Sequence, residues 1–210
     1  LLFSHYFIDE AHHVKAKTWE SFISKFDNSK VIQFTATPFR NDGQKLNGKI
    51  IFNYTIKKAQ EQGYYQKINN YQVIKYSLEE ADRTIAAKAI NILKSDLDNG
   101  FDHIIMARCK SKKRAEEVYK VYQQYKEFSP IVVYSGMRNG LATLKAIKEK
   151  KHRIIVCVNM LGEGYDLPQL KIAAIHDDKQ SLAVTLQFIG RFTRTNDIKL
   201  GPASFITNIA

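Results

Sequence analysis

The stretch "HIIMARCKSKKRAEEVYKVY" at residues 103–122 contains one complete unit of the fold that the sequence predicts. Its first six residues are mostly apolar and predict a buried strand, after which Ser111 is placed to begin a helix. The residues of that helix expected to face a core are Ala115, Val118, Tyr119 and Tyr122. The stretch therefore predicts a strand followed by a helix that packs against it.

The same alternation continues on both sides of this unit. Further apolar runs predict strands at residues 71–76, 131–134, 153–158, 171–177 and 203–209. Apolar residues at helical spacing predict helices around Ile85, Ala89, Ile92 and Leu93, around Leu141, Leu144 and Ile147, and around Leu182, Leu186 and Ile189. Ser77 and Glu80 predict a capping box for the first of these helices, and Gly100 its end. This pattern is typical of an α/β fold with a parallel sheet, in which ligands bind beyond the carboxyl ends of the strands.

Weaker signals precede this alternation. They are strands at residues 1–9 and 31–34, a helix at 15–26, and a connector at 39–70 with a short helix around 56–62. We therefore expect residues 1–65 to be the C-terminal part of one domain and residues 66–210 to form a second domain. Because the chain opens inside a strand pattern, we also expect it to be part of a longer protein.

Composition and charge limit the class of protein. Of the 210 residues, 44% are hydrophobic and 25% are charged, as is usual for a soluble globular protein. The sequence has no apolar run of membrane-spanning length and no signal-peptide pattern, so we expect a cytoplasmic location and no membrane partner. Cys109 and Cys157 lie in or beside apolar runs, which favours a reducing compartment. The net charge of +11 favours a polyanionic partner such as nucleic acid; a generically basic protein is the alternative.

Two adjacent acids follow the first predicted strand. In "YFIDEAHH" at residues 6–13, Asp9 and Glu10 stand side by side where the apolar run ends. Two neighbouring carboxylates repel each other, so they are best tolerated near a cation, a basic partner or solvent. The alternative is a polar turn between strand and helix, with Asp9 as the helix cap.

An amide and two guanidinium groups form a stripe on the predicted helix near the C-terminus. Gln187, Arg191 and Arg194 lie at positions i, i+4 and i+7, so they share one side of that helix. Two guanidinium groups in that place suggest a phosphate ligand, and a solvated basic face is the alternative.

A second group of cations lies at the start of the helix that follows Ser111. Its members are Lys110, Lys112, Lys113 and Arg114. Cations at a helix N-terminus oppose the helix dipole, whereas the main-chain amides there attract anions. A docked phosphate would reconcile the two effects; a merely solvated lysine cluster is the alternative.

Taken together, four motifs resemble those of the superfamily 2 helicases and translocases, in the order that family shows. They are "DEAHH" (9–13), "TATPFRNDG" (35–43), "GEGYDLP" (162–168) and "QFIGRFTR" (187–194). Within the superfamily they are most similar to the branch of type I and III restriction motor subunits and XPB-like helicases. The resemblance implies two RecA-like lobes, the first incomplete, that bind ATP and Mg²⁺.

The resemblance also implies roles for individual residues. Asp9 would hold Mg²⁺, largely through water, while Glu10 would orient and deprotonate the attacking water. His12 would link the nucleotide site to the interface between the lobes, and Thr35 and Thr37 would couple the two lobes. Gly164 and Asp166 would bind the nucleotide, and Gln187 and Arg191 would contact its γ-phosphate. Arg194 would be the arginine finger.

In related motors, the loop that contains the second group of cations lies along the nucleic-acid strand. The resemblance thus assigns nucleic-acid contacts to Arg108, Lys110, Lys112, Lys113 and Arg114. Many relatives also carry a threonine contact where Val158 stands here, so that contact is absent or comes from Asn159.

One required motif is incomplete in this chain. "GQKLNGKI" at residues 43–50 has the glycine and lysine spacing of a phosphate-binding loop, but Ile50 replaces the hydroxyl residue and no strand precedes it. We therefore expect that loop upstream of Leu1, and negligible ATP hydrolysis by this chain alone.

These observations predict part of an ATP-dependent motor that moves on nucleic acid, with DNA favoured over RNA by the branch resemblance alone. Nuclease or specificity subunits or domains would lie outside these residues. One alternative is a non-motor nucleic-acid-binding or scaffolding module with a degenerate ATPase site. Another is a restriction or phage-defence motor subunit that translocates without separating strands.

Overall fold

The structure is a computed structural model. It describes residues 5–9, 11, 21, 24–25, 30–35, 48–64, 68–134, 136–137, 140–158, 167–177 and 200–210. The described residues up to Asn53 belong to one compact unit and those from Tyr54 onward to another. The short helix predicted around residues 56–62 therefore goes with the second unit.

The first unit contains a pair of parallel strands. β1 (Tyr6–Ile8) pairs with β2 (Val31–Gln33). Main-chain hydrogen bonds from Phe34 to Ile8 and from Ala11 to Phe34 continue the pairing beyond the strand ends. The strands predicted at residues 1–9 and 31–34 are thus confirmed in their described parts, whereas the predicted helix at 15–26 lies almost wholly outside the described residues.

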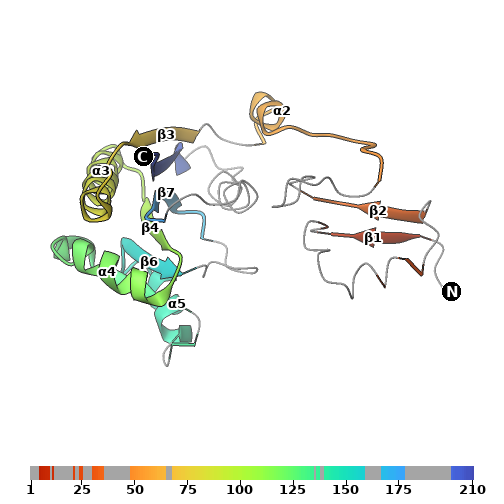
Figure 1. Cartoon of the computed structure of the whole chain (residues 1–210). Coiled ribbons are helices and arrows are strands. Elements are labelled where there is room, and N and C mark those ends of the chain that lie inside the picture. Colours follow the sequence, from red (N-terminus) through yellow and green to blue (C-terminus); the bar gives the residue numbers. More distant parts are fainter. Residues whose placement is uncertain are drawn as a thin grey trace. The chain divides into compact units, whose positions relative to one another are not determined.

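The second unit is built on a six-stranded parallel sheet with the strand order β3-β8-β7-β4-β6-β5. Figure 1 labels β3, β4, β6 and β7 of this sheet. Its strands are β3 (Ile68–Val73), β4 (Ile104–Cys109), β5 (Ile131–Val133), β6 (Ile154–Val158), β7 (Leu170–Ile175) and β8 (Ala203–Asn208). Every pairing in the sheet is parallel, which confirms the predicted fold class. β4 and β7 are central neighbours and are buried along their whole length.

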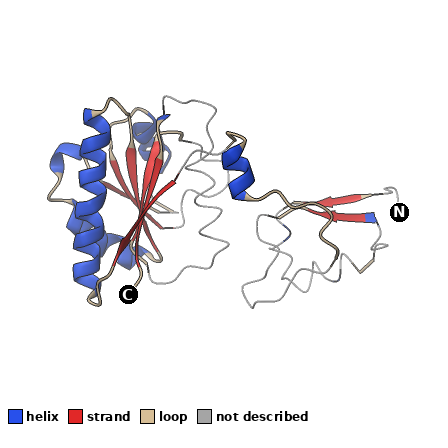
Figure 2. Ribbon diagram, turned by 90° about the horizontal axis from the view of Figure 1, so that it is seen from above, coloured by secondary structure: helices blue, strands red, loops and turns tan. Residues whose placement is uncertain are grey.

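The described helices of this unit are α2 (Ile56–Glu61), α3 (Leu78–Asp98), α4 (Lys112–Tyr122) and α5 (Gly140–Lys148), with a 3₁₀ turn at Lys126–Phe128. α3 and α4 lie together on one face of the sheet (Figure 2). The core under them includes the predicted inward residues Ala115, Val118 and Tyr122, all fully buried. Within the described part of the chain, no helix is long and apolar enough to cross a membrane. The helix predicted around residues 182–189 lies outside that part.

The ends of α3 and α4 follow from local sequence. Ser77 and Ser111 are the N-cap residues, and the Ser111 hydroxyl accepts a hydrogen bond from the Arg114 main-chain N–H at 3.2 Å. Ser77 makes no such side-chain bond, so the predicted capping box with Glu80 is wrong. Instead, Glu80 approaches Lys75 at 3.8 Å. Gly100 ends α3 with φ of 81°, a left-handed conformation that favours glycine.

The strand predicted at residues 71–76 lies three residues earlier, at Ile68–Val73. β3 is an edge strand that pairs with β8 alone, so it tolerates the polar Asn69 and Asn70. Ile74 and Tyr76, which suggested a longer strand, are 61% and 93% exposed. Exposed apolar residues beyond a strand give the same sequence pattern as buried ones, so the pattern extends past the end of β3.

Candidate nucleic-acid interface at the carboxyl edge of the sheet

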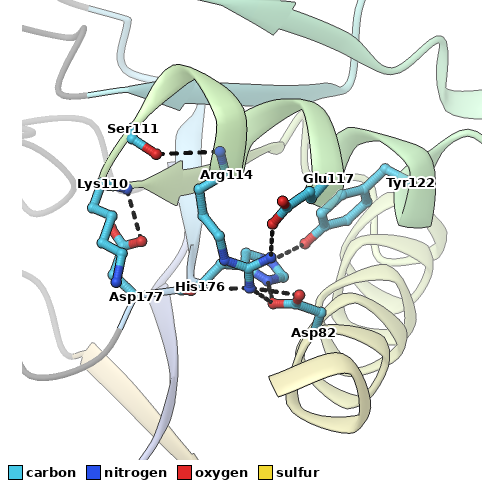
Figure 3. A network of polar contacts seen from close by, with 8 residues as sticks. All are labelled: Asp82, Lys110, Ser111, Arg114, Glu117, Tyr122, His176 and Asp177. Carbon is cyan, nitrogen blue, oxygen red and sulfur yellow. Dashed lines mark hydrogen bonds and ion pairs between the residues drawn. The ribbon is translucent and has the colours of Figure 1, made fainter. Parts of the chain in front are cut away.

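The carboxyl ends of β4 and β7 bring two polar segments together. Lys110 and Ser111 follow β4, and His176 and Asp177 follow β7 (Figure 3). The strands are hydrogen-bonded neighbours, and the His176 main-chain N–H donates to the Arg108 carbonyl at 3.1 Å. This edge is where an open parallel sheet usually binds its ligand.

The predicted cations separate into exposed and buried groups. Lys110, Lys112 and Lys113 are exposed, and the ammonium group of Lys112 lies 5.0 Å from the centre of the Tyr134 ring. No acidic residue lies in the first turn of α4. The described N-terminal turn of α4 thus presents lysine side chains and main-chain amides, both of which attract phosphate groups.

Arg114 does not belong to this exposed group, and its assignment to nucleic-acid contact stays a prediction. Its side chain is 8% exposed, and its Nη2 lies 2.5 Å from a carboxylate oxygen of Asp82 on α3 (Figure 3). Nη1 approaches Glu117 at 3.4 Å. A guanidinium group paired in this way joins α4 to α3 and is turned away from solvent.

Arg108 is also buried, with 8% of the residue exposed. Burial lowers the pKa of its guanidinium, while the nearby Asp177 carboxylate raises it. Arg108 therefore lies inside the fully buried β4 and does not join the exposed lysines, and its assignment to nucleic-acid contact stays a prediction.

Asp82 is the centre of a buried polar network that the sequence analysis missed. Its carboxylate binds Arg114 and also lies 2.8 Å from Nδ1 of His176. Nε2 of His176 lies 3.0 Å from the hydroxyl of Tyr122, which is fully buried. Burial raises the pKa of Asp82, but His176 and Arg114 together outweigh burial and leave that pKa below its ordinary value.

Asp177 supports the lysine loop from the other side. Its Oδ1 accepts a hydrogen bond from the Lys110 main-chain N–H at 2.7 Å (Figure 3). Burial raises the pKa of Asp177 above its ordinary value, although the Lys110 hydrogen bond and the Arg108 cation lower it. The apolar run at residues 171–177 predicts a single strand, whereas β7 ends at Ile175 and a polar loop follows it.

The predicted nucleotide site is described only in small part. Asp9 is exposed directly after β1, and Thr35 follows β2, so both lie at the carboxyl ends of paired parallel strands. An exposed carboxylate oxygen is a ligand type that Mg²⁺ accepts. No group of three or more His, Cys, Asp or Glu residues that could hold a metal ion occurs among the described residues. The remaining predicted residues lie outside them: Glu10, His12, Thr37, Asn159, Gly164, Asp166, Gln187, Arg191 and Arg194.

The parallel sheet with helices packed on it has the fold of a RecA-like lobe. The chain belongs to the helicase family, because the family model "Helicase conserved C-terminal domain" matches residues 88–196. A second model, "Type III restriction enzyme, res subunit", matches residues 2–40. These matches confirm the resemblance to superfamily 2 helicases that the four motifs indicated.

Relatives with curated names are helicases. The chain is 22% identical to "Putative helicase 22" of Sulfolobus islandicus filamentous virus, over 91% of this chain and 40% of that protein. It is 31% identical to "ATP-dependent RNA helicase SUB2-2" of Vanderwaltozyma polyspora, over 58% of this chain and 26% of that protein. The chain thus spans less than half the length of each.

Solved structures show the same fold. The structure of S. cerevisiae Dbp5 bound to RNA and ADP BeF3 matches 98% of this chain and 53% of its own, with a TM-score of 0.58 and 13% identity. Domain 2 of the DEAD-box helicase Mss116p, bound to an RNA duplex, matches 69% of this chain and 55% of its own, with a TM-score of 0.51 and 14% identity.

Proposed function

We propose that this chain is part of an ATP-dependent motor that moves along nucleic acid, and that its second unit contacts the strand through Lys110, Lys112 and Lys113. The exposed lysines at the start of α4 carry this proposal, since they lie at the ligand-binding edge of a helicase lobe. Phosphate contacts of this kind supply affinity without sequence preference. The role is therefore that of a general grip on the backbone.

The motor activity rests on the family and on the motif residues, most of which lie outside the described ranges. In this proposal Asp9 holds Mg²⁺, Glu10 activates water, and Arg194 stabilises the charge that develops during phosphoryl transfer. Gly164, Asp166, Gln187 and Arg191 bind the nucleotide, and His12, Thr35 and Thr37 connect its site to the second lobe. Coupling between the sites would turn hydrolysis into steps along the strand.

The choice between DNA and RNA has support on each side. The match of residues 2–40 to a restriction-enzyme subunit favours DNA. The yeast relative is named an RNA helicase, and the two solved structures above contain RNA. We propose DNA, because the restriction-type match covers the acidic-pair motif, and we make RNA an outcome of the test.

The test measures binding of the 210-residue chain to fluorescent single-stranded DNA and RNA at several salt concentrations. Each lysine contact should contribute roughly −0.7 to the log–log slope of affinity against salt. Replacing Lys112 and Lys113 by Ala should therefore flatten the slope by about 1.4. The base preference should stay unchanged, since phosphate contacts carry no sequence information.

A matched control removes the same charge elsewhere. Lys120 and Lys126 are exposed at and beyond the other end of α4, and their double replacement by Ala should leave the slope close to that of the wild type. Equal slopes for the wild type and the Lys112/Lys113 variant would refute the lysine contact. Tighter binding of RNA than of DNA would refute the choice of DNA.

In the full-length protein, the same Lys112/Lys113 variant should need more single-stranded DNA for half-maximal ATP hydrolysis. Its kcat at saturating DNA should be close to the wild-type value, because the lysines bind the strand and do not touch the nucleotide. Glu10→Gln should abolish hydrolysis at every DNA concentration. Hydrolysis that neither DNA nor RNA stimulates in the wild type would contradict the motor proposal.

A further inference from the structure

Asp177 introduces negative charge into an otherwise cationic loop. It is 8% exposed and lies directly beyond β7, beside the segment that carries the exposed lysines. A carboxylate in this place weakens the attraction of a phosphate strand. Its burial also has a cost, which is seen in the raised pKa of its carboxyl group. The benefit that offsets this cost comes from the hydrogen bond that the carboxylate accepts.

The carboxylate holds the main chain of Lys110. Its Oδ1 lies 2.7 Å from the Lys110 nitrogen, a short hydrogen bond to a charged acceptor. This bond links the end of β7 to the first residue after β4, across two neighbouring strands. The main chain of the lysine loop is therefore fixed from outside its own segment (Figure 3).

The other contacts of the loop are arranged around this bond. The Arg108 carbonyl accepts from the His176 N–H at 3.1 Å, and the Ser111 hydroxyl accepts from the Arg114 N–H at 3.2 Å. Arg114 itself is anchored on Asp82. The hydrogen bond from Lys110 to Asp177 supports the main chain between the end of β4 at Cys109 and the N-cap of α4 at Ser111. Without it, the described loop would lose its side-chain support at Lys110.

We propose that Asp177 is a positioning residue of the nucleic-acid surface, which fixes the Lys110 main chain so that the lysines of the loop meet successive phosphates. The inference rests on the proposed function, because it needs a strand bound at this loop. Long lysine side chains are mobile, so a fixed main chain reduces the ordering cost of binding. The benefit comes from the hydrogen-bond acceptor, and the negative charge opposes it.

Two substitutions separate the acceptor from the charge. Asp177→Asn keeps a carbonyl oxygen in place and removes the charge, so it should bind single-stranded DNA as tightly as the wild type or more tightly. Asp177→Ser removes the charge but is too short to reach Lys110. It should weaken binding about two- to tenfold, the range for one net hydrogen bond. If charge alone mattered, both variants would bind more tightly.

The experiment measures the affinity of the 210-residue chain for fluorescent single-stranded DNA in both variants at fixed salt. Asp102 provides the control, since it precedes β4 at the opposite edge of the sheet. Asp102→Asn and Asp102→Ser change the charge equally and should leave the affinity close to the wild-type value. Amide hydrogen exchange at Lys110 checks the fixed main chain: exchange should be faster in Asp177→Ser than in Asp177→Asn.

Three results would overturn the inference: unchanged or tighter binding by Asp177→Ser, weakened binding by Asp177→Asn, or equal Lys110 exchange in the two variants. If Asp177→Ser fails to fold, the affinity of Asp177→Asn and its Lys110 exchange relative to the wild type still decide. If the wild type binds no strand, the proposed function and the inference fall together. If the wild type binds and the Lys112/Lys113 variant binds weakly while Asp177→Ser matches the wild type, only the inference falls.

Discussion

A histidine–aspartate pair lies near each end of the parallel strands: the pair at the carboxyl ends is buried, whereas the pair at the amino ends joins a buried histidine to a partly exposed aspartate. At the carboxyl edge, His176 contacts Asp82 at 2.8 Å and the Tyr122 hydroxyl at 3.0 Å. At the amino edge, Nδ1 of His103 lies 2.7 Å from Asp96 and Nε2 lies 2.6 Å from the Leu200 carbonyl. The geometry of each pair is similar, so the difference lies in what surrounds it.

At the carboxyl ends of the strands one buried carboxylate serves two partners, whereas at the amino ends separate carboxylates serve separate partners. Asp82 serves both His176 and Arg114 inside the domain. At the amino edge, a separate and partly exposed carboxylate, Asp102, pairs with Lys150 and Arg153. Buried charges depend on one another more strongly than exposed ones. Loss of the single carboxylate of Asp82 would therefore remove a partner from two buried groups, His176 and Arg114, near the lysine loop.

The largest expected effect is that of Asp82→Ala. It leaves the buried Arg114 with only the exposed Glu117 carboxylate at 3.4 Å and should lower the free energy of unfolding by about 3–5 kcal/mol. Asp102→Ala at the amino edge should cost only about 0–1 kcal/mol, as for other partly exposed ion pairs. Urea unfolding of the 210-residue chain, followed by circular dichroism, measures both. Equal losses would remove the proposed difference between the edges.

A smaller effect is expected for Tyr122→Phe. The variant keeps the ring but leaves Nε2 of the buried His176 without the hydroxyl, which should cost about 1–3 kcal/mol. Tyr119→Phe is the matched control on the same helix, because the Tyr119 hydroxyl makes only a long contact of 3.4 Å with the Pro130 carbonyl. A loss no greater than that of the control would show that His176 gains little from Tyr122. The same urea titration serves here.

The smallest effect concerns pH and separates the two aspartates of the carboxyl edge. The pKa of Asp82 is below its ordinary value of 3.8, so its stabilising contribution is present above that value and is lost as pH falls through the lower folded pKa. The pKa of Asp177 is above 3.8, so its destabilising contribution is relieved as pH falls through the higher folded pKa.

The measurement compares unfolding free energies of Asp82→Asn and Asp177→Asn with the wild type across acidic pH. As pH falls, the wild type should lose its advantage over Asp82→Asn and gain stability relative to Asp177→Asn. Because the two dependences have opposite signs, a parallel pH dependence in both variants would contradict the assigned directions. The Asp177 pH window lies above that of Asp82.

Much of the sheet could be predicted because its signals are local. Apolar runs in β4, β6 and β7 and the helical spacing in α3 and α4 follow from which residues stand next to each other. The predicted strand ends were less accurate where exposure mattered, as at Ile74 and Tyr76 beyond β3. The motifs also indicated the helicase family, because their residue types and order are features of the sequence itself.

The same locality limited the prediction of the site. Lys112, Lys113 and Arg114 are consecutive cations, and nothing in that stretch distinguishes the two exposed lysines from the buried arginine. The distinction comes from Asp82, which lies 32 residues earlier, and from His176, which lies 94 residues after Asp82.

By itself, therefore, the sequence determined the alternation of strands and helices, the helix starts at Ser77 and Ser111, and the cations that follow β4. Only the tertiary structure decided which cations face solvent and which carboxylates support them. The physical reason is that β7 lies beside β4 in the sheet although a long stretch of chain separates them. Because His176 and Asp177 follow β7, they lie beside the loop after β4. Their hydrogen bonds then determine which polar groups are buried there.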